Sequence, residues 1–305
     1  MGTPRFAVVC LKKLLESGKN IAAVVTTPDK PVGRGHKISP SPVKIEALKS
    51  GLMIFQPENL KEPDFLTRID NLKPDLMVIV AFRILPEILF LKAKKGAVNL
   101  HGSLLPKYRG AAPINWAIIN GESETGITTF FLKKKVDTGN IINQEKIKIS
   151  PSMTAGELHD IMAEKGADLL LKTIKQIESG HIETYTQVES EVSNAPKIFS
   201  KDCLINFNQP VKKIHDFIRG LSPKPGAYTY HKNKRIHLFD SSISDELIIE
   251  SDIGSLISTG NSKSLFIQCN PGILEVKEIK IEGKRRMLVG DFLRGHSFPP
   301  NTIFG

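Results

Sequence analysis

Residues 97–101 read AVNLH, the last of three short runs that decide the fold. The other two are IAAVVTT at 21–27 and DLMVIVA at 75–81, and all three are rich in the apolar and β-branched residues that favour strands. Stretches with helical periodicity, such as FAVVCLKKLLESG and SPVKIEALKSG, lie elsewhere in this part of the chain. The alternation indicates βαβ units, and it predicts an α/β, Rossmann-like domain with a mainly parallel sheet.

This first domain is predicted to span residues 1–182. TGITTFFL at 125–132 and NIINQEKIKI at 140–149 read as two later strands. A T-x-x-E capping box then opens a pattern with apolar residues at helical spacing over 154–179, and Gly180 follows it. A long helix is therefore expected to close the domain.

The composition changes after this helix. Residues 183–199 are polar, aperiodic and contain proline, as a linker does. One helical pattern, PVKKIHDFIRGL, then precedes short apolar runs separated by Gly, Asn and Ser. The sequence thus predicts a small antiparallel, OB-like β-barrel domain over residues 200–305.

Charge and cysteine content restrict the class of protein. The net charge of +10 favours a polyanionic partner without naming one. The three cysteines are odd in number and form no C-x-x-C pair, so we expect reduced thiols and no metal site. No apolar run approaches the ~20 residues that span a bilayer, and no signal peptide is recognisable, which favours a cytoplasmic protein without a membrane contact.

The opening MGTPRFAVV reads as the turn and helix that follow a strand, yet no strand stands before it. The first strand of a doubly wound sheet is usually central. We therefore expect an unfilled slot in the sheet, and a natural protein that starts several residues upstream.

Asn99 and His101 interrupt the third strand with polar groups. They are two residues apart, so they share one face, at the end of a parallel strand where ligands bind in such sheets. The N-x-H spacing alone is more typical of ordinary buried residues. The Gly- and Pro-rich stretch at 102–113, GSLLPKYRGAAP, favours a ligand site beside them.

Asp137 is a third candidate, in KKKVDTGNI. Aspartic proteases also use D-T-G, but they need two such aspartates, and FDSS at 239–242 does not supply the second. A lone aspartate in a turn is usually a turn residue. Together with His101, however, its carboxylate could orient and polarise the imidazole.

Several of these segments resemble the 10-formyltetrahydrofolate-dependent formyltransferases. The resemblance rests on VNLHGSLLPKYRGAAPINWAIINGE, TGIT and DTGNII, and it extends to MGTPRFAV, FQPENL, ILPEIL and IHDFIRGLSPKPGAYT. The SLLP loop indicates only the reaction type. The loop PVGRGHKISPSPVK is more specific to family members that act on charged initiator tRNA.

The resemblance implies a role for each matching residue. The formyl donor would be 10-formyltetrahydrofolate, the acceptor the α-amino group of initiator methionyl-tRNA, and no metal would be needed. The implied catalytic residues are Asn99, His101 and Asp137. The implied folate site comprises Ser103, Leu104, Leu105, Pro106, Phe82 and Leu85, and the implied tRNA contacts are Arg34, Lys37 and Lys44.

Two alternatives remain open at the level of sequence. A sugar-nucleotide formyltransferase would share the chemistry, but such enzymes usually carry arginine where this chain has Ala111, and they lack the Arg34 loop. A non-catalytic folate- or RNA-binding protein would not need Asn99, His101 and Asp137 together. The chain also reads AFRILP where many family members have A-Y-G before I-L-P, which leaves open whether Arg83 reaches solvent or the folate tail. A monomer is expected, because no long apolar surface stripe is recognisable.

Overall fold

The computed structural model describes residues 1–32, 37–244, 251–257, 263–299 and 302–305. The chain forms two compact units. The first contains Met1–Gly110, Thr125–Ile147 and His159–Asn194, and the second contains Ala111–Glu124, Lys148–Leu158 and Ala195–Gly305. The second unit thus includes two segments that the sequence places within residues 1–182, and the boundaries at 182 and 200 stay predictions.

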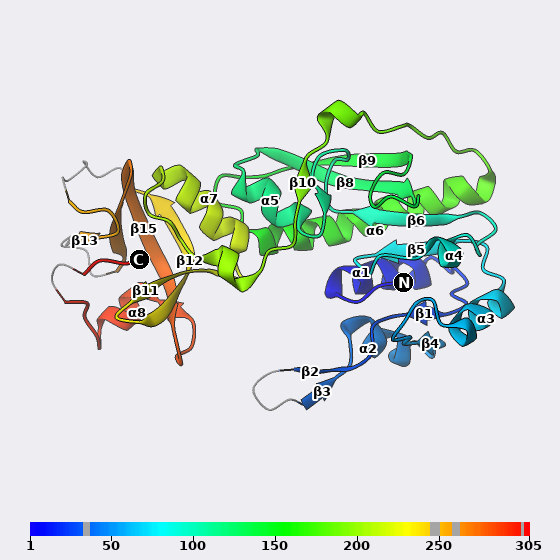
Figure 1. The fold of residues 1–305 in the computed structure, drawn as a ribbon, viewed down its shortest axis with the longest axis horizontal. Helices are drawn as coiled ribbons and strands as arrows, with labels where there is room; N and C mark the ends of the chain where they lie inside the picture. The colour runs from blue at the N-terminus through cyan, green and yellow to red at the C-terminus, as the bar shows by residue number, and fades with distance from the viewer. Residues whose placement is uncertain (33–36, 245–250, 258–262, 300–301) are drawn as a thin grey trace. The chain divides into compact units, whose positions relative to one another are not determined.

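The first unit is built on parallel strands, as the sequence predicts (Figure 1). β5 (Met77–Val80) pairs in parallel with β6 (Ala97–His101), and β6 pairs antiparallel with β8 (Glu124–Phe131). The four-stranded sheet ends on β9 (Ile141–Lys148). A separate parallel pair consists of β1 (Val24–Val25) and β4 (Ile54–Phe55).

Amphipathic helices pack on these strands. α1 (Arg5–Glu16) buries Phe6, Cys10 and Leu14, at helical spacing. The remaining helices that begin in this unit are α2 (Pro42–Lys49), α3 (Pro63–Leu72) and α4 (Glu87–Phe90).

The long helix expected over 154–179 is α6 (Ala155–Ser179). Its capping box forms as predicted: the Thr154 N–H donates to Glu157 Oε2 at 2.8 Å, and the Glu157 N–H donates to Thr154 Oγ1 at 3.3 Å. Gly180 follows the last turn with φ 76°, in the left-handed region that glycine adopts without steric cost.

The second unit contains a curled antiparallel sheet with the strand order β11 (Ala227–His231), β12 (Lys234–Ile243), β15 (Gly272–Ile281), β14 (Leu265–Cys269) and β13 (Leu256–Ile257). Register shifts in β12 near Asp240 interrupt its pairing with β15, and such bulges increase strand twist. Ile218 and Leu221 of α7 (Val211–Leu221) are buried in the core of this unit with Leu238 and Ile279. This unit also contains β16 (Met287–Leu288), α5 (Pro113–Ile119) and α8 (Val289–Leu293).

The three cysteines, Cys10, Cys203 and Cys269, are free and buried, as expected of reduced thiols. Burial raises the pKa of the Cys10 and Cys269 thiols to about 12, so both stay protonated at neutral pH. Within the described ranges, no helix combines the length and the apolar character that crossing a membrane requires.

Candidate active site

Asn99 and His101 lie at the carboxyl end of β6. Asn99 stands opposite Ile79 of β5 and Phe130 of β8, while His101 stands opposite Thr128. The His101 side chain is buried and the Asn99 side chain is half-buried. Among the residues that the structure describes, the side-chain amide of Asn99 has no hydrogen-bond partner, so both of its N–H groups can donate to a ligand.

His101 is held in one orientation by the loop that follows it. Its Nε2 bonds to the Tyr108 carbonyl oxygen at 2.9 Å. A carbonyl oxygen can only accept, so Nε2 carries a proton, and in the neutral ring the lone pair is on Nδ1. The Phe130 ring meets the imidazole edge-on, with 6.5 Å between centroids. Nδ1 is therefore the atom of His101 that can accept a proton in a reaction.

The predicted SLLP loop is fixed to the neighbouring strands. Thr128 Oγ1 donates to the Ser103 carbonyl at 2.6 Å and lies 3.1 Å from the Leu105 N–H, which donates to it. Gln144 Nε2 donates to the Leu105 carbonyl at 2.8 Å, and the Leu105–Pro106 bond is cis. Leu104 packs so closely over Gly126 that a Cβ there would lie 2.5 Å from it. This loop is rigid backbone against which a flat ligand can pack.

Phe82, Arg83 and Leu85 follow β5. Leu85 is buried, and Phe82 packs against the same apolar cluster. Arg83 donates to the carbonyl oxygens of Pro57 and Glu58, both at 2.8 Å. Arg83 therefore connects the segment after β5 to the segment after β4.

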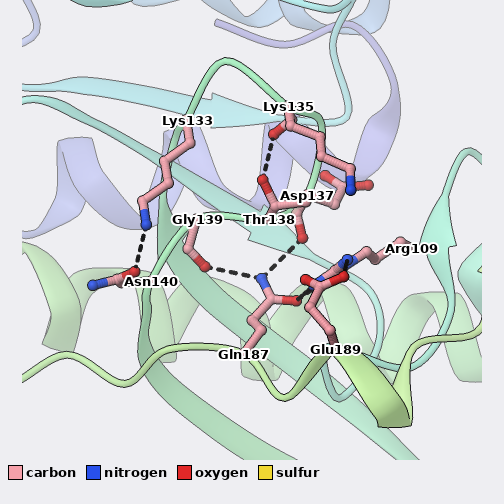
Figure 2. Close-up of polar contacts among 9 residues, drawn as sticks. All are labelled: Arg109, Lys133, Lys135, Asp137, Thr138, Gly139, Asn140, Gln187 and Glu189. Atoms are coloured by element: carbon pink, nitrogen blue, oxygen red, sulfur yellow. Dashed lines mark hydrogen bonds and ion pairs between the residues drawn. The ribbon is translucent and has the colours of Figure 1, made fainter.

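Asp137 lies in a turn between β8 and β9, with φ 55° (Figure 2). Its Oδ2 accepts a hydrogen bond from the Gly110 N–H at 3.0 Å. Asp137 thus bonds to the backbone of Gly110, and His101 bonds to the backbone of Tyr108, rather than the two side chains to each other. A direct carboxylate–imidazole bond would need Asp137 or His101 to rearrange.

A polar network that the sequence did not suggest holds the Asp137 turn (Figure 2). Gln187 Nε2 donates to the carbonyl oxygens of Asp137 and Gly139, at 2.8 and 2.9 Å. Gln187 Oε1 accepts from Arg109 Nη2 at 2.7 Å, and Arg109 also donates to Glu189 at 2.9 Å. This hydrogen bond from Arg109 is the main cause of a lowered Glu189 pKa. Gln187 and Glu189 fall in the predicted linker, where no periodicity marks them.

The predicted tRNA-contacting loop is partly a hairpin. β2 (Lys30–Val32) pairs antiparallel with β3 (Lys37–Ser39), so the backbone of Lys37 lies opposite Val32. Arg34 lies outside the described residues. Lys44 Nζ lies 2.6 Å from Asp29 Oδ2, and this hydrogen bond is the largest cause of a lowered Asp29 pKa. Lys44 therefore joins the two ends of the hairpin segment.

We expect Gln187→Leu to lower kcat about 10- to 100-fold with little change in KM. Leucine keeps the volume of the side chain, but it removes both bonds to the Asp137 turn and leaves Arg109 without its main acceptor, and small misplacements of catalytic groups cost rate steeply. Steady-state kinetics at saturating substrate would measure the loss. Glu189→Gln is the matched control, since it keeps an acceptor for Arg109, and a similar loss in both variants would contradict the assignment to Gln187.

The site combines an amide donor and an imidazole with a free Nδ1 at the carboxyl end of β6, and the Asp137 carboxylate is hydrogen-bonded to the loop that follows β6. Donors at such a position can stabilise a developing oxyanion, and an imidazole can move a proton. In the part of the chain that the structure describes, no group of three or more His, Cys, Asp or Glu could hold a metal ion. The fold is Rossmann-like, and the candidate site contains the kinds of group that an enzyme needs for transfer through an oxyanion.

Comparison with known proteins identifies the family to which the chain belongs. The family model described as Formyl transferase matches residues 1–174, and the one described as Formyl transferase, C-terminal domain, matches 197–297. Methionyl-tRNA formyltransferase of Bacteroides fragilis is 43% identical, covering 97% of this chain and 93% of the relative. That of Desulforamulus reducens is 41% identical, covering 100% and 96%. The chain belongs to the formyl transferase family and, within it, to the methionyl-tRNA formyltransferases.

Solved structures share the fold. The sugar 3N-formyl transferase WlaRD, solved in the presence of dTDP and 5-N-formyl-THF, has a TM-score of 0.67 at 22% identity, covering 93% of this chain and 97% of that one. HypX from Aquifex aeolicus, in complex with tetrahydrofolic acid, has a TM-score of 0.59 at 18% identity, covering 84% of this chain and 45% of that one. At these identities the likeness concerns the fold alone.

Proposed function

We propose that this protein transfers the formyl group of 10-formyltetrahydrofolate to the α-amino group of methionine on initiator methionyl-tRNA, in the cytoplasm, as a step of translation initiation. The observation that carries the proposal is the identity of 43% and 41% to relatives of that name over nearly the whole chain. The amide of Asn99 and the imidazole of His101 at the end of β6 support the proposal, because formyl transfer needs an oxyanion donor and a proton acceptor.

The proposed chemistry uses three side chains. The lone pair of the methionine amine attacks the formyl carbon, and the carbonyl oxygen becomes an oxyanion to which the Asn99 amide donates. His101 takes the proton that the amine loses and helps to deliver a proton to N10 of the folate as the bond between the formyl carbon and N10 breaks. Asp137 would stabilise the imidazolium in that step, because a carboxylate favours the charged ring.

The folate would lie against the SLLP loop and the segment after β5. Its pterin ring is planar and carries several donors and acceptors, which suits backbone groups near Phe82 and Leu85. Ser103, Leu104, Leu105 and Pro106 would line the other part of the site. The fixed backbone of this loop supports the assignment, because a preorganised surface loses little entropy on binding.

The tRNA would be held by the basic hairpin and by the C-terminal part of the chain. We propose that residues 1–182 form the formyltransferase domain, that 183–199 form the linker, and that 200–305 form an OB-like domain that binds tRNA. The net charge of +10 supports a polyanionic partner, since phosphate contacts dominate affinity for nucleic acid. We also propose that the protein acts as a monomer, which light scattering on the purified protein would test.

Acceptor choice is the decisive experiment. Purified protein would be incubated with 10-formyltetrahydrofolate and either charged initiator tRNA or an amino-sugar nucleotide. We expect formylmethionine only with the tRNA, and Asn99→Ala should lower the rate of its formation about 10²- to 10³-fold. Formylation of the sugar nucleotide alone would instead establish a sugar N-formyltransferase, and no product with either acceptor would favour a binding protein.

We expect Arg34→Lys to lower kcat/KM with initiator tRNA about tenfold despite its preserved charge. Arginine contacts phosphate in a bidentate manner or stacks on bases, and lysine does neither. Kinetics with charged tRNA would measure the change, with folate affinity as the control. Normal kinetics of Arg34→Lys and Arg34→Ala alike would exclude a role of Arg34 in tRNA recognition.

A further inference from the structure

The backbone of Tyr108 is strained. Its φ is 60°, in the left-handed region that a bulky residue rarely adopts, and its side chain is buried. Strain of this kind persists only where the surrounding structure holds it, and it is concentrated at functional sites. The Tyr108 carbonyl oxygen is the acceptor for His101 Nε2, so the conformation of Tyr108 decides what the imidazole faces. The contacts that hold Tyr108 therefore bear on the orientation of His101.

The peptide group before the Tyr108 Cα atom is held at both ends. Its carbonyl oxygen, which belongs to Lys107, accepts a hydrogen bond from Ser103 Oγ at 2.6 Å. Its N–H, which belongs to Tyr108, donates to Ser193 Oγ at 2.9 Å. Because a peptide group is planar, bonds to its two opposite ends fix the orientation of the whole plane. The Ser193 hydroxyl therefore helps to fix the first of the two planes that define the conformation of Tyr108.

The peptide group after the Tyr108 Cα atom is held in the same way. Its carbonyl oxygen is bonded to His101 Nε2 at 2.9 Å. Its N–H, which belongs to Arg109, donates to the Ser193 carbonyl at 2.9 Å. Ser193 thus supplies two of these four bonds, one from its side chain and one from its backbone. It lies 85 residues from Tyr108 in the sequence, so no local pattern marks the contact.

The same short segment also holds Asp137. Gly110 follows Arg109 directly, and its N–H donates to Asp137 Oδ2 at 3.0 Å. The carbonyl at the start of the segment therefore faces His101, the N–H at its end faces Asp137, and the bond to the Ser193 carbonyl lies between them. A displacement of this backbone would move the partners of both side chains.

We propose that Ser193 is a positioning residue for the reaction: it holds Tyr108 in its strained conformation, and the Tyr108 carbonyl then keeps the proton of neutral His101 on Nε2. The lone pair of Nδ1 is thereby left for the substrate amine. The inference rests on the proposed function, in which His101 takes a proton from that amine. Which nitrogen of a neutral imidazole carries the proton is set by the hydrogen bonds of the ring. Without the Ser193 hydroxyl, the strained backbone can relax and turn the carbonyl away, and both tautomers become available.

The tautomer of His101 in the substrate-free protein is the direct measurement. Nitrogen–proton NMR correlation spectra of protein labelled in histidine distinguish the two tautomers of a neutral ring, and the His101 signal is assigned by its absence in His101→Ala. At alkaline pH, where imidazoles are neutral, we expect the wild type to show the Nε2–H tautomer alone. Ser193→Ala should show both tautomers in exchange. A single Nε2–H tautomer in Ser193→Ala would overturn the inference, whatever the turnover of this variant.

Steady-state kinetics measure the consequence for the reaction. Ser193→Ala should lower kcat about tenfold and leave KM for both substrates within about twofold, because a misplaced reacting group costs rate more than it costs ground-state binding. Ser193→Thr keeps a hydroxyl at this position, so it should restore both the single tautomer and the wild-type kcat. A loss in Ser193→Thr as large as that in Ser193→Ala would contradict a role of the hydroxyl.

Ser17→Ala is the matched control, because it removes another serine hydroxyl of the first unit, which donates to the Leu14 carbonyl at 2.8 Å. It should change neither the His101 tautomer nor kcat. The two measurements also separate this inference from the proposed function. Mixed tautomers with a normal kcat in Ser193→Ala would support the position that Ser193 gives to His101, and they would refute the proposed proton transfer by His101.

Discussion

Replacing Asn99 or His101 by alanine is expected to lower kcat about 10²- to 10⁴-fold. The Asn99 amide would donate to the oxyanion, and loss of one such donor costs ~10²- to 10³-fold, while a positioned acid–base group contributes ~10²- to 10⁴-fold. Both groups act where charge and protons move, so folate affinity should change little. Single-turnover formyl transfer and titration with folate would measure the two quantities separately.

The control for both variants is Lys107→Ala, on the exposed part of the same loop. It alters the surface beside the site without touching the proposed reacting groups, so its kcat should stay near that of the wild type. His101→Ala also removes the bond to the Tyr108 carbonyl, and thermal denaturation would reveal any loss of structure. Near-normal turnover of either Asn99→Ala or His101→Ala in a folded protein would refute the proposed site.

The parts of the fold that the sequence predicted are those set by local patterns. The three apolar runs became β1, β5 and β6, and the capping box at Thr154 begins α6 as expected. Strand periodicity also placed Asn99 and His101 on one face of β6, because alternate residues of a strand share a face. Each of these features depends on residues close together in the chain.

The unpredicted parts depend on contacts between distant segments. Gln187 reaches Asp137 and Gly139 across some fifty residues of sequence, and nothing local distinguishes it from the polar residues around it. Helix α5 packs in the second unit because its Asn115 donates to the Gly220 carbonyl at 2.8 Å and Ile119 lies against the same glycine. Such pairings follow from the tertiary fold, which periodicity does not encode.

The turn that carries Asp137 depends on close packing around Gly139. The turn fits between β8 and β9 only because Gly139 has no side chain: a Cβ there would clash with the Phe131 carbonyl oxygen and lie 2.7 Å from the carbonyl carbon. The Phe131 N–H donates to the Asn140 carbonyl at 3.0 Å beside this contact. Backbone atoms cannot move aside as a flexible side chain can, so any larger residue must displace the turn.

Gly139→Ala is therefore expected to lower the free energy of unfolding by about 3 kcal/mol, the upper end of the usual cost of overpacking, and to lower kcat about 10²-fold by moving Asp137. Urea denaturation and single-turnover kinetics would measure the two effects. Gly295→Ala is the control, because a Cβ there meets nothing within 4 Å and both effects should be absent. If Gly139→Ala lost stability but kept its turnover, the position of Asp137 would not limit the reaction, and the carboxylate would be a turn residue after all.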